Sequence, residues 1–115
     1  MPTPQPGRFV RGSTTGRPLM AALDLLGRRW ALRVLWELRD GPIGARALLA
    51  RCEGLSPSVL YERLRELGEA GLVTRDGEQY LLTPLGSSLR NAIQPLDRWA
   101  RRWAQESGES EGSRE

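Results

Sequence analysis

The sequence predicts a mainly α-helical fold with a small β-hairpin (α+β), and three observations carry that prediction. Apolar residues recur at helical spacing in successive segments between residues 18 and 104. A short connection that contains glycine, 52–55, separates two of these segments, as the turn of a helix-turn-helix does. The spacing then changes to period two over residues 72–82, around Asp76-Gly77. A helix-turn-helix followed at once by a hairpin is typical of a winged helix-turn-helix.

The first three predicted helices are short. Pro18 opens a helix whose apolar positions are Leu19, Ala22, Leu23 and Leu26. A second helix, from about Arg29, has an apolar face made of Trp30, Val34, Leu35 and Leu38. Asp40-Gly41-Pro42 ends that helix, and we expect Trp30 to lie in the core. Ile43 is expected in a very short strand, before a third helix over 45–51 that buries Leu48 and Leu49.

The start of the fourth helix is the best-specified local feature of the chain. Ser56 is a good N-cap and Pro57 suits the first helical position. Leu55 before the cap is placed to pack on Leu60. The helix is predicted over about 56–70, with Leu60, Leu64 and Leu67 facing inward.

Two strands are predicted after this helix, 72–75 and 79–82. Asp76-Gly77 between them is a strong signal for a type I′ turn. In that register Arg75 faces Glu78 and Val73 faces Tyr80 across the hairpin.

A long helix is predicted from Thr83 as N-cap and Pro84 as first residue. Its apolar residues form a heptad seam made of Leu85, Leu89, Ala92, Leu96, Trp99 and Trp103. Because large aromatic residues suit interfaces, we expect Trp99 and Trp103 of this seam to lie at a dimer interface, together with Leu89 and Leu96. The tryptophans could instead form the wall of an apolar effector pocket between subunits.

Composition sets the limits of the domain and of its chemistry. The 115 residues include no histidine, no lysine and one cysteine, so all 17 basic residues are arginines. Ser-His-Asp and Cys-His catalysis, structural zinc and an internal disulfide are excluded, and we expect no enzyme, metal or cofactor. Cys52 is expected to be a small, partly buried filler. The predicted folded domain is 18–104, between a disordered basic tail (1–17) and a disordered acidic tail (105–115).

The sequence contains no run of 18 apolar residues, so we expect no segment that spans a membrane. The first residues also lack the apolar core of a signal peptide. We therefore expect a small cytoplasmic protein with no membrane partner.

The outward face of the fourth helix carries groups that suit double-stranded DNA. Ser58, Glu62 and Arg65 follow one another at helical spacing, with Tyr61 beside them. Arginine can donate twice to guanine and glutamate can accept from cytosine, while Ser56, Ser58 and the free N–H groups of the helix start suit phosphate. Glu62 and Arg65 are also an ordinary i, i+3 ion pair of an exposed helix.

The charge balance opposes a simple DNA-binding prediction. Residues 44–82 hold five arginines against six acidic residues, a net charge of −1. Positive charge lies outside this region, at Arg28, Arg29, Arg33, Arg98, Arg101 and Arg102. We therefore expect phosphate contacts from outside the motif and binding as a dimer, and we keep a winged-helix protein-interaction module with little DNA affinity as the alternative.

Six segments, in order, resemble the HxlR-type winged helix-turn-helix regulators: 22–30, 38–42, 54–60, 63–67, 70–73 and 82–86. The resemblance covers about residues 18–104 and implies a prokaryotic, nucleoid-associated transcription regulator that binds its operator as a homodimer. It also implies an interface built by helices near both ends of the domain, which adds Leu19 and Leu23 of the first helix to the candidate dimer residues. Carried over by position, Ser56, Ser58, Tyr61, Glu62 and Arg65 fall on the recognition helix, and 75–78, with Arg75 and Gly77, fall on the wing.

Two positions depart from the family pattern. Many members carry a cysteine directly before the proline of the first helix, and some use it to sense electrophiles or oxidants. Here that position is Arg17, so this thiol switch is absent, and any small-molecule effector would need another site. The wing is also shorter than is usual for the family.

Overall fold

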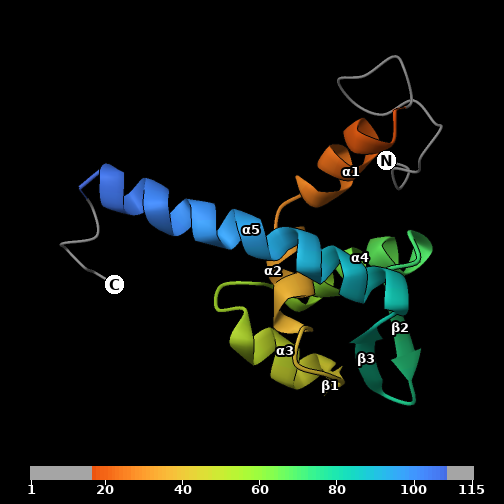
Figure 1. The fold of residues 1–115 in the computed structure, drawn as a ribbon. Coiled ribbons are helices and arrows are strands. Elements are labelled where there is room, and N and C mark those ends of the chain that lie inside the picture. The colour runs from red at the N-terminus through yellow and green to blue at the C-terminus, as the bar shows by residue number, and fades with distance from the viewer. Residues whose placement is uncertain (1–16, 109–115) are drawn as a thin grey trace.

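The structure is a computed structural model that describes residues 17–108. The predicted tails therefore fall almost entirely outside the described residues. The helices and strands follow the predicted order: α1 (Pro18–Leu26), α2 (Ala31–Glu37), β1 (Ile43–Gly44), α3 (Ala45–Arg51), α4 (Pro57–Glu69), β2 (Val73–Asp76), β3 (Gln79–Leu82) and α5 (Pro84–Glu106). This is a mainly helical winged helix-turn-helix with a long C-terminal helix, as the sequence predicts (Figure 1).

α2, α3, α4 and the sheet form the body of the molecule, and α1 and the C-terminal half of α5 project from it (Figure 1). The core is made of apolar residues from every element except α5. Its fully buried members are Val34, Leu38, Leu48, Cys52, Leu60 and Leu67. Along α5 the only buried residue is Gly86. Most of α5 is therefore without a covering layer within the described chain.

The turn between α1 and α2 differs from the prediction. α2 begins at Ala31 rather than at about Arg29, because Trp30 adopts the left-handed conformation, with φ of 76°. A helix cannot propagate through a left-handed residue, so the apolar spacing that included Trp30 placed the helix start too early. Trp30 is half-buried and packs against the core.

The short strand expected at Ile43 is present, and it makes the hairpin a three-stranded antiparallel sheet in the order β1-β3-β2. The predicted hairpin register is wrong. Arg75 lies opposite Tyr80 and Val73 opposite Leu82, so the turn residues are Gly77-Glu78 rather than Asp76-Gly77. Of the two turn residues only Gly77 has a positive φ, 65°, which matches a turn with glycine at its first central position. The two registers differ by two residues and keep the same residues inward, so alternation alone does not separate them.

The N-terminus of α5 is fixed against the end of α4. Thr83 caps α5 by accepting from the N–H of Gly86, and its hydroxyl donates to the carbonyl of Gly71 over 2.7 Å. A Cβ atom on Gly86 would lie 2.1 Å from the carbonyl oxygen of Leu72, so only glycine fits this crossing. From there α5 runs to Glu106, two residues past the domain boundary expected from the sequence, with Pro95 inside it.

Candidate nucleic-acid interface

The helix α4 begins as the sequence predicts. Ser56 is the N-cap, and its hydroxyl accepts from the N–H of Val59 over 3.3 Å. The inward face buries Leu60, Leu64 and Leu67. The residues predicted to face outward are all exposed: Ser56, Ser58, Tyr61, Glu62 and Arg65. The helix therefore presents hydroxyls at its N-terminus, followed by an aromatic ring and a charged pair.

Arg65 is held by two carboxylates of its own helix. Its guanidinium lies 2.5 Å from Glu62 Oε2 and 2.7 Å from Glu69 Oε2. The hydrogen bonds to Glu62 and Glu69 raise the pKa of Arg65, and the hydrogen bond from Arg65 lowers the pKa of Glu62. All three groups are about half exposed. The outward face therefore offers Arg65 and Glu62 as a mutually paired unit rather than as separate charges.

A second ion cluster lies on the inner side of α4, and sequence reasoning missed it. Glu66 is 4% exposed and accepts from Arg28 on one oxygen and from Arg63 on the other, each over 2.8 Å. Arg63 also donates to the carbonyl oxygen of Arg29 over 2.7 Å. The i, i+3 spacing of Arg63 and Glu66 was a signal that their side chains could meet. Nothing local in the sequence points to Arg28, which lies 38 residues earlier.

Arg28 and Arg33 were expected to supply positive charge for DNA, but both side chains make contacts within the protein. Arg28 is nearly buried in the ion cluster. Arg33 donates to Glu37 over 2.8 Å and to the carbonyl oxygen of Arg51 over 2.6 Å. Both guanidiniums therefore hold elements of the body together.

The wing is short and fully exposed at its tip. Arg75, Asp76, Gly77 and Glu78 are all exposed, and the Arg75 guanidinium carbon lies 5.1 Å from the ring centroid of Tyr80. This cation–π contact follows from the observed register, which places the two residues opposite each other. Arg75 is the only basic residue of the hairpin, beside two acids.

Comparison with known proteins identifies the family to which the chain belongs. The family model described as HxlR-like helix-turn-helix matches residues 25–108. The chain belongs to this family. The HTH-type transcriptional regulator YvaP of Bacillus subtilis is 33% identical over 89 residues, which are 71% of this chain and 82% of YvaP. YodB of the same organism is 30% identical over 96 residues, 77% of this chain and 86% of YodB.

Solved structures agree with the family. The structure of quinone-bound YodB matches with a TM-score of 0.70 at 32% sequence identity. The match covers 73% of this chain and 96% of the YodB chain. A transcriptional regulator of Enterococcus faecalis V583, described as of the MarR family, matches with a TM-score of 0.71 at 29% sequence identity. The match covers 88% of this chain and 98% of that regulator's chain. This HxlR-type chain is therefore a helix-turn-helix DNA-binding transcriptional regulator and not an enzyme.

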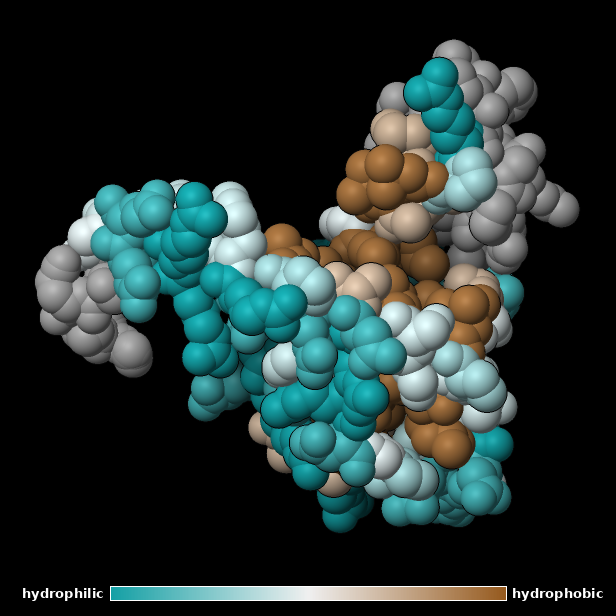
Figure 2. Space-filling view, viewed as in Figure 1, coloured by the Kyte–Doolittle hydropathy of each residue, from teal (hydrophilic) through white to brown (hydrophobic). Residues whose placement is uncertain are grey.

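The candidate dimer residues of this HxlR-type chain lie on α1 and α5. Leu19 and Leu23 of α1 and Leu96, Trp99 and Trp103 of α5 are each at least half exposed. Trp99 and Trp103 stack, with ring centroids 5.6 Å apart. Apolar residues gather over α1 and between α1 and the body (Figure 2).

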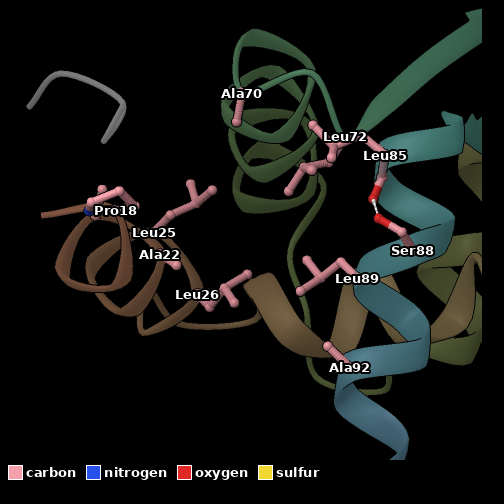
Figure 3. A pocket seen from close by; sticks show the side chains of 11 residues that line it. Pro18, Ala22, Leu25, Leu26, Ala70, Leu72, Leu85, Ser88, Leu89 and Ala92 are labelled. Atoms are coloured by element: carbon pink, nitrogen blue, oxygen red, sulfur yellow. Dashed lines mark hydrogen bonds between the residues drawn. The ribbon is translucent and has the colours of Figure 1, made fainter. Parts of the chain in front are cut away.

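Between α1 and α5 this surface is hollowed into a groove of about 390 Å³. Leu26 of α1 and Leu89 of α5 point toward each other across it (Figure 3). Ser88 is its one hydroxyl-bearing lining residue, and that hydroxyl donates to the carbonyl oxygen of Leu85 over 2.7 Å. The groove is thus almost wholly apolar, and α1, α5 and the end of α4 line it.

Three further features concern metal binding, membrane insertion and the single thiol. Residues 17–108 contain no cluster of three or more potential metal ligands. None of their helices is long and apolar enough to cross a membrane. Cys52 is fully buried rather than partly buried, and burial raises the pKa of its thiol.

Proposed function

We propose that this HxlR-type chain binds a specific two-fold-symmetric operator as a homodimer, with α4 in the major groove and the wing beside it. The observation that carries the proposal is the outward face of α4. It presents exposed Ser58, Tyr61, Glu62 and Arg65 directly after a helix start whose N–H groups and hydroxyls suit phosphate. The proposed DNA residues are Ser56, Ser58, Tyr61, Glu62, Arg65, Arg75 and Gly77.

Base reading by this face requires an exchange of partners. To donate twice to guanine O6 and N7, Arg65 leaves at least one of its carboxylates. When Glu62 is the carboxylate released, it can accept from the amino group of a cytosine. A base pair that offers neither group leaves Arg65 with its intrahelical partners, so the exchange itself favours one sequence over others.

The homodimer is proposed from the uncovered apolar surface of α1 and α5. A second copy would cover Leu19, Leu23, Leu96, Trp99 and Trp103, and it would narrow the groove beside Leu89. A two-fold axis through this contact gives two α4 helices that face one side of the duplex. We expect half-sites about one helical turn apart, roughly 34–36 Å.

An apolar small-molecule effector is the further expectation for the groove between α1 and α5. A solved relative, YodB, carries a quinone in one structure. In this chain Arg17 stands directly before Pro18, so an effector would be bound by the leucines of the groove and not by a thiol at that position. We propose that the protein acts in the cytoplasm, on the nucleoid.

The alternative is a winged helix that docks proteins and has little DNA affinity. The observation in its favour is the net charge of −1 over residues 44–82, together with the pairing of Arg65 within its helix. In the first function α4 contacts DNA, and in the alternative it contacts a protein. Selection of bound DNA fragments distinguishes the two.

The test is selection of bound fragments from random and genomic DNA by the purified chain, at low and at physiological salt. One palindromic motif that stays enriched at physiological salt is the expected result. Loss of all enrichment before physiological salt would overturn the proposal and favour the protein-interaction function.

A further inference from the structure

The turn between α1 and α2 contacts the recognition helix through buried charge. Arg28 Nη1 lies 2.8 Å from Glu66 Oε2, and the two side chains are 10% and 5% exposed. The other oxygen of Glu66 accepts from Arg63, so the carboxylate is shared between the turn and its own helix. Hydrogen bonds between buried charged groups are short and directional, and they fix an angle more narrowly than contact between apolar side chains does.

The same turn also contacts the loop that precedes α4. Trp30 is left-handed, and its ring lies 3.8 Å from the place that a Cβ atom on Gly54 would occupy. The carbonyl oxygen of Arg29 accepts from Arg63 Nε over 2.7 Å. Three consecutive residues, 28–30, therefore hold α4 at its middle and at the turn before it.

The other end of α4 is held by α5. The hydroxyl of Thr83 donates to the carbonyl oxygen of Gly71, and Gly86 packs on the backbone of Leu72 with no room for a side chain. α4 thus has one fixed connection toward α1 and one toward α5. These are the two helices whose apolar faces are uncovered.

We propose that Arg28 and Glu66 are positioning residues that set the angle of α4 to α1, and through it the spacing between the two half-sites. The inference rests on the proposed function, because it needs a dimer built on α1 and α5. In such a dimer the separation of the two recognition helices depends on how each α4 is oriented to the helices at the two-fold axis. One base pair changes the half-site separation by about 3.4 Å, so a loosened connection widens the range of spacings that fit.

The test variant is Arg28→Met, since Glu66 keeps its bond to Arg63 when Arg28 is removed. Arg28→Lys keeps the charge and is expected to restore the wild-type behaviour. Arg46→Met is the control: it also removes one arginine, from an exposed position of α3. Thermal melting establishes that each variant is folded.

The first readout is binding to a library of paired half-sites that differ only in spacing. Wild type, Arg28→Lys and Arg46→Met are expected to prefer one spacing. Arg28→Met is expected to lose this preference several-fold while it keeps the same half-site sequence. An unchanged spacing profile in folded Arg28→Met overturns the inference and leaves the proposed function intact.

The second readout needs no DNA. A spin label on Tyr61→Cys reports the distance between the two α4 helices of a dimer, because position 61 is exposed and the native Cys52 is fully buried. The distance distribution is expected to broaden in Arg28→Met and not in Arg46→Met. Equal widths overturn the inference. If wild type gives no distance between labels, or enriches no paired site, the dimeric function fails and the inference fails with it.

Discussion

Glu66, in the middle of the recognition helix, shares its carboxylate between Arg28, 38 residues earlier in the chain, and Arg63, one turn before it. The three side chains form a nearly buried ion cluster that no apolar pattern describes. It connects the part of the chain that we propose meets DNA with the turn that follows α1.

Glu66→Gln is expected to destabilise the fold by about 2 kcal/mol, because it removes the charged acceptor that Arg28 and Arg63 share, while Arg28 keeps its pair with Asp24 at 3.8 Å. Unfolding in urea measures the change. Glu106→Gln removes the acid of an exposed pair and is the control, with an expected change below about 1 kcal/mol. Similar values for the two variants would mean that the buried cluster adds nothing to stability.

Gly86→Ala is expected to destabilise the fold by about 3 kcal/mol or more, since the new Cβ would meet the carbonyl oxygen of Leu72 at 2.1 Å. Gly68→Ala is a matched control within α4. Its Cβ would lie 3.6 Å from the carbonyl oxygen of Val73, which is an ordinary contact, so alanine should stabilise the helix by about 0.5–1 kcal/mol. Urea unfolding decides; a Gly86→Ala variant as stable as wild type would contradict the close crossing of α5 and Leu72.

Trp99→Ala combined with Trp103→Ala is expected to convert the dimer to a monomer, because the stacked pair is the largest exposed apolar element of α5. Analytical ultracentrifugation measures the assembly. Arg101→Ala with Arg102→Ala changes the same stretch of helix outside the seam and should stay dimeric. A dimeric tryptophan double variant would show that the seam is not the main interface.

Glu69→Gln is expected to raise DNA affinity by about two- to fivefold, since it removes one of the two carboxylates that hold Arg65. Glu53→Gln, at an exposed position in the turn before α4, makes the same change in net charge. Fluorescence anisotropy with the selected operator compares the two variants. An equal gain from both would assign the effect to net charge and not to release of Arg65.

Cys52 provides a prediction about pH. Burial raises the pKa of its thiol above the ordinary value of 9.0, so the folded chain keeps the proton at pH values where the unfolded chain loses it. The free energy of unfolding should therefore fall as pH rises above 9.0, and this fall should be smaller in Cys52→Ser. Urea unfolding across that range tests it, and identical slopes for the two proteins would remove Cys52 as the cause.

The sequence was sufficient where the signals are local. Ser56 and Thr83, each followed by proline, mark the starts of α4 and α5, and the structure has both as N-caps. The change to period two after residue 71 located the wing, and spacing alone placed Leu60, Leu64 and Leu67 inside and Arg65 outside. Each of these depends on neighbours within a few residues.

Features that depend on distant residues could not be predicted in the same way. The apolar spacing of 30–38 gives no sign that Trp30 is left-handed, and it does not show that the ring lies beside Gly54 in the loop before α4. The hairpin register is selected between two arrangements with the same inward residues. The contact between Glu66 and Arg28 is found only when α4 and the turn after α1 are placed together in space.

The most direct test of base reading by α4 is the affinity of Arg65→Ala for the selected operator and for versions of it with one base pair changed at a time. Wild type is expected to lose about 1–3 kcal/mol of binding free energy at a G·C pair in each half-site, and Arg65→Ala to lose that discrimination at this pair alone. If Arg65→Ala binds every version more weakly by the same factor and keeps all base preferences, Arg65 contacts phosphate, and its role in base reading is contradicted.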